Sequence, residues 1–233
     1  MSLRGEAHRA AIRAVLDAFG ADAAPFVFVG GCTLGLYARR TGAPLRATKD
    51  VDCISTLSPW VLQEKKLADM CSGGVLSPDP DVQCRYRIRG TEFDVDVLSP
   101  DGFNVGGVNP WFARAAKTAQ PYDAGDGRSV MAVTPPYFLA TKLAAFEDRG
   151  PDAQSSRDME DIVALVVEVD DIVELVDAAG IRTDVAQLWT GALSKYGLGM
   201  GDLPDMVDWH LDRREADSRD RAVDAITLLV RGV

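Results

Sequence analysis

The spacing of apolar residues changes at Thr134-Pro135-Pro136, and this change limits the folds open to the chain. Upstream, short apolar runs such as Phe26-Val27-Phe28-Val29 alternate with turn residues, which is typical of strands set between helices. Downstream, apolar residues recur at three- and four-residue spacing, which predicts helices only. We therefore expect an α/β (α+β) fold, with a small mixed β-sheet core in residues 1–134 and a helical C-terminal domain in residues 135–233.

The same reasoning predicts individual elements. In the first part we expect helices over 3–19, through 34–37 and from a cap at Ser58, with Pro59 in its first turn, to about residue 70. Strands are expected over 26–29, 50–54, 120–122 and 129–133, with a hairpin of 83–89 and 92–98 around Gly90-Thr91 and a loop over 101–109. The expected C-terminal helices are 137–148, 156–167, 172–178, 184–196, 206–213 and 219–230.

Composition excludes several function classes. Lys and Arg number 25 against 35 Asp and Glu, a formal net charge of −10, so a broad basic surface for long nucleic acid is not expected. The apolar runs are too short to span a bilayer and the start resembles no secretion leader, so we expect a cytoplasmic protein that binds no membrane. The four cysteines form no CxxC pair, and the two histidines, His8 and His210, are expected at the surface or in an interface. A metal would therefore be held by oxygen, as magnesium or manganese.

Two pairs of aspartates carry the chemical signal. Asp50 and Asp52 lie two apart on an expected strand, so both carboxylates point to one face, and Asp94 and Asp96 repeat this on the second hairpin strand. Like charges this close repel unless a cation lies between them. A third carboxylate beside the first pair would complete an oxygen cage for two metal ions in phosphoryl transfer. The alternative is an exposed acidic strand face.

Three arginines alternate on the other hairpin strand. Arg85, Arg87 and Arg89 are each two residues apart, so they share one side of the strand. A local basic groove is one interpretation. The other, which we favour, is a solvated strand face.

The order of these motifs resembles a known family. Gly30-Gly31, a helix, Arg46-x-Thr48-x-Asp50-x-Asp52 and a later strand aspartate are similar to the DNA polymerase beta superfamily of nucleotidyltransferases. The segment from Leu139 to Phe146 with Arg149-Gly150, followed by Arg157-Asp158-Met159-Glu160-Asp161, resembles the third and fourth motifs of the AbiE-type toxin nucleotidyltransferases. The resemblance covers about residues 26–165, and the helices after about residue 170 match nothing recognisable.

The resemblance implies roles for the residues near the strands. Gly30 and Gly31 would let the backbone approach a triphosphate, with the Thr33 hydroxyl on phosphate. Asp50 and Asp52 would ligate metal. The third carboxylate is Asp96 or Asp94, of which Asp96 matches better because Val97-Leu98 follow it, and it would serve as base toward the attacking hydroxyl. Arg46 and Thr48 belong to the nucleotide motif or only shape the turn.

The resemblance also implies roles for the first C-terminal helices. Lys142 would contact the triphosphate, with Arg149 beside it, and Asp158 or Asp161 would be the fourth-motif acid. Lys142 and Arg149 are seven residues apart, so they share one side of their helix at the edge of its apolar stripe. The alternative is that they are ordinary helix charges, and that the aspartates are helix N-terminal acids. In either case a helix-edge Lys142 is expected to contribute little to stability.

The expected reaction is transfer of a nucleoside monophosphate from a nucleoside triphosphate (NTP) to a hydroxyl, with Mg2+ or Mn2+. The resemblance to AbiE-type toxins suggests RNA, a tRNA end or a protein as acceptor, and an antitoxin as partner. A small-molecule acceptor is also open, since the acidic balance fits large RNA less well. The alternative from another class is a non-catalytic nucleotide-binding or toxin–antitoxin partner protein of the same fold.

Overall fold

The computed structural model describes residues 3–40, 45–100, 109–149, 153–211 and 216–231. The chain forms two compact units. The sheet unit comprises Gly5–Leu36 and Arg46–Thr134; the helical unit combines Met1–Arg4 and Tyr37–Leu45 with Pro135–Val233. The α/β (α+β) fold class predicted from the sequence is confirmed, and the chain is not divided by one cut at residue 134 because two earlier segments group with the helices.

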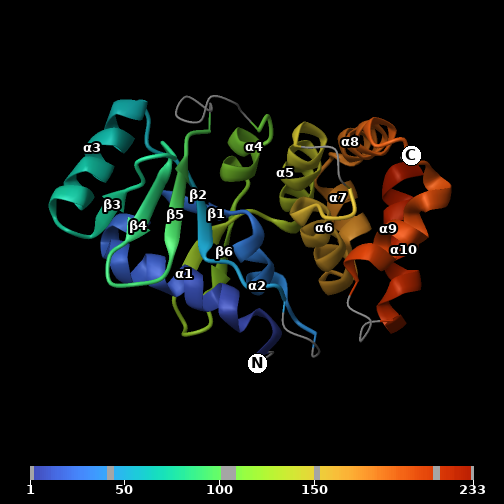
Figure 1. The fold of residues 1–233 in the computed structure, drawn as a ribbon, viewed down its shortest axis with the longest axis horizontal. Helices are drawn as coiled ribbons and strands as arrows, with labels where there is room; N and C mark the ends of the chain where they lie inside the picture. Colours follow the sequence, from blue (N-terminus) through green and yellow to red (C-terminus); the bar gives the residue numbers. More distant parts are fainter. Residues whose placement is uncertain (1–2, 41–44, 101–108, 150–152, 212–215, 232–233) are drawn as a thin grey trace. The chain divides into compact units, whose positions relative to one another are not determined.

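One mixed sheet forms the centre of the sheet unit (Figure 1). Its order among the described residues is β3-β4-β5-β2-β1-β7-β6. β2 pairs with β5, and β1 with β7, in parallel, and the remaining neighbours are antiparallel. The strands are β1 (Phe26–Val29), β2 (Asp50–Ser55), β3 (Leu76–Pro78), β4 (Arg85–Ile88), β5 (Asp94–Leu98), β6 (Gln120–Asp123) and β7 (Ser129–Ala132).

Side-chain alternation divides the sheet into an apolar and an acidic face. Val51, Cys53, Val95 and Val97 alternate with the four aspartates of β2 and β5, and all four of these apolar residues are fully buried. They join a core with Phe26 and Phe28 of β1 and with apolar residues of two helices, α1 (Glu6–Phe19) and α3 (Trp60–Ser72). Burial of one face therefore fixes the register that gathers the aspartates on the other.

The ends of the sheet and of α1 follow local residue chemistry. Both edge strands contain a proline, Pro78 in β3 and Pro121 in β6, as expected where one side of a strand needs no partner. The apolar stripe of α1 runs through Ile12 and Val15, and the helix ends at Gly20, which has a positive φ of 54°. The described part of this unit also contains the short helices η2 (Gly20–Ala23), η3 (Gly31–Thr33), α2 (Leu34–Tyr37), whose last residue groups with the helical unit, and α4 (Phe112–Lys117).

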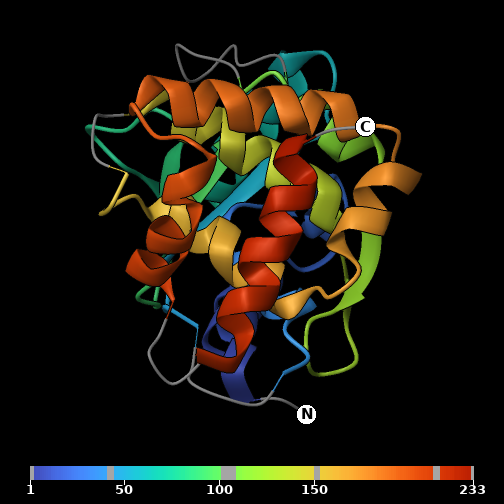
Figure 2. The same cartoon turned by 90° about the vertical axis from the view of Figure 1, so that its right-hand side faces the viewer.

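The helical unit contains the C-terminal helices. They are α5 (Pro135–Asp148), α6 (Arg157–Glu168), α7 (Ile172–Ala178), α8 (Arg182–Lys195), α9 (Leu203–His210) and α10 (Ala216–Arg231). α10 packs against α6, α8 and α9 (Figure 2), and Trp189 of α8 is fully buried. Ser156 is the N-cap of α6, and its Oγ accepts a hydrogen bond from the Met159 backbone N–H at 3.3 Å. Among the described helices, none is long and apolar enough to cross a membrane.

The structure corrects several local predictions. Pro59, not Ser58, is the N-cap of α3, and no side chain caps that end. The short elements β3 and α4 were not predicted. His8 is 3% exposed, with its Nε2 2.7 Å from the Arg46 carbonyl oxygen, so of its two predicted positions, surface or interface, the surface is wrong. Most of the predicted loop over 101–109 lies outside the described residues.

The cysteines give a test of the buried face of the sheet. Burial raises the pKa of the Cys53 thiol well above its usual value, and the nearby Cys32, Asp52 and Asp96 raise it further. Since the thiolate is the reactive form, alkylation of the native protein at pH 8 is expected to label the partly exposed Cys71 first and Cys53 only on unfolding. Peptide mass spectrometry with and without denaturant measures this, and equal native labelling of Cys53 and Cys71 would contradict the fold.

Candidate functional site

The four aspartates of β2 and β5 form two adjacent rows on one face of the sheet. In the parallel register Asp50 lies opposite Asp94 and Asp52 opposite Asp96. β2 and β5 are neighbours near the middle of the sheet (Figure 1), so the carboxylates lie side by side. The sequence predicted that each pair shares a face, and the pairing of the two strands brings both pairs to the same face.

Two arginines of β4 extend these rows. Arg85 lies opposite Asp96 and binds it with two hydrogen bonds, from Nε to Oδ1 at 2.8 Å and from Nη2 to Oδ2 at 2.9 Å. Arg87 lies opposite Asp94, with Nε 2.5 Å from Oδ1. Carboxylates raise the pKa of both guanidinium groups, chiefly through these hydrogen bonds. The favoured prediction of a solvated strand face is therefore wrong for Arg85, whose side chain is 28% exposed, while Arg87 is 61% exposed, as predicted, and also pairs with Asp94.

The sequence contained a signal for these pairs. A hairpin centred on Gly90-Thr91 places Arg87 across from Asp94 and Arg85 across from Asp96, as observed. The two motifs were interpreted separately, one as acidic ligands and the other as surface charge. The hairpin register joins them into charge pairs.

Gly30 lies directly under the Asp52 carboxylate. β1 ends beside Asp52, since Val29 pairs with it, and Gly30 follows with a positive φ of 74°. A Cβ added to Gly30 would lie 2.0 Å from Oδ2 of Asp52. Gly30 is therefore required twice, once by its backbone conformation and once by the space that the carboxylate occupies.

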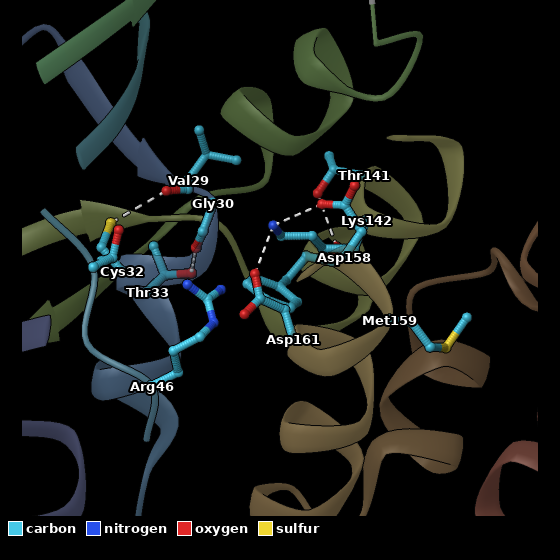
Figure 3. A network of polar contacts seen from close by, with 12 residues as sticks. Val29, Gly30, Cys32, Thr33, Arg46, Thr141, Lys142, Asp158, Met159 and Asp161 are labelled. Carbon is cyan, nitrogen blue, oxygen red and sulfur yellow. Dashed lines mark hydrogen bonds and ion pairs between the residues drawn. The ribbon is translucent and has the colours of Figure 1, made fainter. Parts of the chain in front are cut away.

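The turn after β1 is held by its own side chains (Figure 3). The Thr33 hydroxyl donates to the Gly30 carbonyl at 2.9 Å, and the Cys32 thiol donates to the Val29 carbonyl at 3.3 Å. Thr33 is fully buried. In this structure its hydroxyl stabilises the turn, and the predicted phosphate contacts of Thr33 and Gly31 stay predictions.

The segment that enters β2 is shaped by Thr48. Its Oγ1 donates to the Asp50 carbonyl at 3.0 Å and lies 3.2 Å from the Asp50 backbone N–H, which donates to it. Two residues earlier, the exposed Arg46 presents its backbone carbonyl to His8. These contacts give both residues a structural role at the start of β2, and their predicted nucleotide contacts stay predictions.

In the helical unit, Lys142 lies between two aspartates (Figure 3). Its Nζ on α5 is 3.0 Å from Oδ1 of Asp158 and 2.7 Å from Oδ2 of Asp161, both on α6. Arg149, the residue after the end of α5, lies 3.1 Å from Asp158, so Lys142 and Arg149 contact the same carboxylate. The side chains of Lys142, Asp158 and Asp161 are 13%, 4% and 7% exposed. The expectation that Lys142 contributes little to stability is therefore revised, while its predicted triphosphate contact and those of Arg149, Asp158 and Asp161 stay predictions.

The sheet face suits a hard divalent cation by its chemistry. Asp50, Asp52 and Asp96 offer carboxylate oxygens on adjacent strands, and magnesium and manganese prefer such ligands. Over the described residues, no three or more His, Cys, Asp or Glu side chains converge in positions that would hold a metal. The Asp96 oxygens are turned to Arg85 and those of Asp94 to Arg87.

Comparison with solved structures finds distant likeness. An antigenic nucleotidyltransferase-like protein from Paracoccidioides brasiliensis shares 16% identity at a TM-score of 0.47, over 82% of this chain and 94% of that one. JHP933 from Helicobacter pylori shares 16% at 0.46, over 99% and 94%. A proposed nucleotidyltransferase from H. pylori shares 13% at 0.37, over 99% and 96%. No family profile and no curated protein matches the chain. Function is therefore inferred from the chain's own residues.

The contact between Gly30 and Asp52 generates a stability prediction. Gly30→Ala is expected to lower the free energy of unfolding by roughly 2–5 kcal/mol, because it combines a strained backbone with a clash against the carboxylate. Gly90→Ala is the matched control: its φ is +79° with no atom within 4 Å of the added Cβ, so strain alone applies, at about 1–2 kcal/mol. Urea unfolding measures both. Equal losses would contradict the contact.

The cluster around Lys142 generates a second prediction. Lys142→Ala is expected to lower the free energy of unfolding by about 3–5 kcal/mol, because it removes the ammonium group that lies within hydrogen-bond distance of two buried carboxylates. Arg219→Ala is the control in the same unit, since it breaks an ion pair with Asp208 that is far more exposed, and little change is expected. Thermal unfolding of both variants decides the matter, and an unchanged Tm for Lys142→Ala would restore the helix-edge interpretation.

Proposed function

We propose that the protein is a nucleotidyltransferase that moves a nucleoside monophosphate from an NTP to a hydroxyl acceptor and releases pyrophosphate. The observation that carries this proposal is the shared sheet face of Asp50, Asp52 and Asp96, with Gly30 ending the neighbouring strand under Asp52. The resemblance of the motifs around Gly30-Gly31 and Asp50-Val51-Asp52 to the polymerase-beta-type enzymes supports the same reaction.

The residues of this face divide the chemical work. Asp50 and Asp52, with Asp96 or Asp94 as third carboxylate, would hold Mg2+ or Mn2+, which supplies charge neutralisation to the triphosphate and the leaving pyrophosphate. Asp96 would accept the proton of the attacking hydroxyl. The acceptor oxygen bonds to the α-phosphorus as the bond between that phosphorus and the pyrophosphate oxygen breaks. Gly30, without a side chain, lets the Asp52 carboxylate keep its position beside the end of β1.

The acceptor class is the finer part of the proposal. The resemblance to AbiE-type toxins favours an RNA or tRNA end, or a protein hydroxyl, and with it an antitoxin partner. The net charge of −10 favours a small acceptor instead. Because the two indications oppose each other, the acceptors are best offered together in one assay.

One observation favours the non-catalytic alternative. Asp94 and Asp96, the two choices for the third carboxylate, are each paired with an arginine. A protein that binds nucleotide without turnover can keep such pairs permanently. Measurement of pyrophosphate release from NTP and Mg2+, with total tRNA, total protein and small hydroxyl compounds supplied in parallel, separates the two functions and identifies the acceptor class. A bound NTP without pyrophosphate release under every acceptor would establish the non-catalytic alternative.

The two β2 aspartates give the decisive variants. Asp50→Asn and Asp52→Asn are each expected to reduce kcat at least about a hundredfold, because each removes a negative charge from the metal-binding face while conserving side-chain shape. Asp69→Asn is the control, since Asp69 is exposed on α3 and its loss should leave turnover unchanged. Steady-state kinetics with each NTP gives the comparison. Wild-type turnover in either β2 variant would remove the metal assignment.

A further inference from the structure

Arg85 reaches across two strands of the acidic face. It binds both oxygens of Asp96 on β5, and its Nη2 also lies 3.6 Å from Oδ1 of Asp50 on β2. One guanidinium group therefore offsets part of the negative charge of carboxylates on both strands that the proposed metal site needs. Its planar group of N–H donors matches the two oxygens of a carboxylate, which makes this pair directional as well as attractive.

Arg87 forms a weaker version of the same pair. It contacts Asp94 alone, and its side chain is 61% exposed, against 28% for Arg85. The acidic partners are both sheltered, at 13% exposure for Asp96 and 16% for Asp94. Because solvent screens an exposed charge more strongly, Arg85 is the arginine whose charge matters most on this face.

A divalent cation and Arg85 need the same oxygens. A cation held by Asp50, Asp52 and Asp96 would place its double charge beside the guanidinium group, and the two positive groups repel. Either the hydrogen bonds between Arg85 and Asp96 break, or Asp96 gives the cation only its remaining lone pairs. In both cases Arg85 weakens the affinity for the cation.

We propose that Arg85 is a built-in counter-ion that competes with the divalent cation for Asp96 and Asp50 and so sets the metal affinity of the site. This inference rests on the proposed function, because it needs a cation to bind there. Arg85 keeps the acidic face neutralised when no cation is bound. It also makes cation binding dependent on an arriving triphosphate, whose negative charge can draw the guanidinium group away from Asp96.

The test is direct measurement of Mn2+ binding, by electron paramagnetic resonance of the unbound ion. Wild-type protein, Arg85→Met and Arg87→Met are compared without nucleotide. We expect Arg85→Met to bind Mn2+ about tenfold more tightly or better, and Arg87→Met to change the Kd at most about threefold. Arg128→Met is the control for net charge, because Arg128 pairs with Asp17 and Asp126 away from these strands.

Two further variants secure the interpretation. Arg85→Lys keeps the charge but loses the paired hydrogen bonds, so an intermediate Kd is expected, and it covers the case in which Arg85→Met does not fold. Removing Arg85 in an Asp96→Asn background should give a smaller gain than it gives in the wild-type background, because only the 3.6 Å contact between Arg85 and Asp50 is then left to contest.

The outcomes separate the inference from the function beneath it. Tighter Mn2+ binding in the Arg85 variants only, dependent on Asp96, supports the proposal. An unchanged Kd in both Arg85 variants overturns it while leaving the proposed function standing, and so does an equal gain in Arg87→Met or Arg128→Met, which would be a general charge effect. Absence of Mn2+ binding in every protein, with and without NTP, overturns the proposed metal site and the inference together.

Discussion

Repulsion between carboxylates is the constraint on which the sheet unit depends. The parallel pairing of β2 and β5 sets Asp50 beside Asp94 and Asp52 beside Asp96, so that four like charges share one face. Solvent screening reduces the repulsion between carboxylates this close only in part, and the fold needs cations among them. Arg85 and Arg87 on β4 supply two, because the hairpin register places one arginine opposite each aspartate of β5. The order β4-β5-β2 therefore pairs opposite charges as well as backbone hydrogen-bonding groups.

The acidic face exists because the opposite face is apolar. Val51 and Cys53 on β2, and Val95 and Val97 on β5, are fully buried, and shifting either strand by one residue would bury its aspartates instead. On the β1 side of β2, only glycine fits at position 30, since any larger residue there would displace the Asp52 carboxylate. Packing therefore fixes where the charges lie, and the charges in turn restrict which residues their neighbours can be.

The sequence predicted most of this fold because its signals are local. The hydrophobic run of β1, the alternation in β2 and β5 and the apolar stripes of the C-terminal helices each arise within one element. The sequence predicted less well where the structure of a segment depends on its contact with another segment. His8 is buried because α1 packs closely against Gly35 of α2, which the sequence of α1 alone does not indicate. The three residues of β3 become a strand only by pairing with β4. For the site, the sequence grouped the aspartates correctly on each strand but did not join them to the arginines. That step needs the register of two elements at once.

Both units place a basic side chain between carboxylates, but the two clusters differ in their exposure to solvent. Lys142 is enclosed with Asp158 and Asp161, and all three side chains are 13% exposed or less, so solvent and a hydrated ion have little access to this cluster. On the sheet face, Arg85 is 28% and Asp50 43% exposed, so water and a hydrated ion have access. A guanidinium group that solvent can reach is one that a stronger cation can displace. Within the described residues, exposure therefore marks Arg85 and Asp50 as the groups suited to exchange one charged partner for another, and the aspartates of α6 as the ones suited to keep theirs.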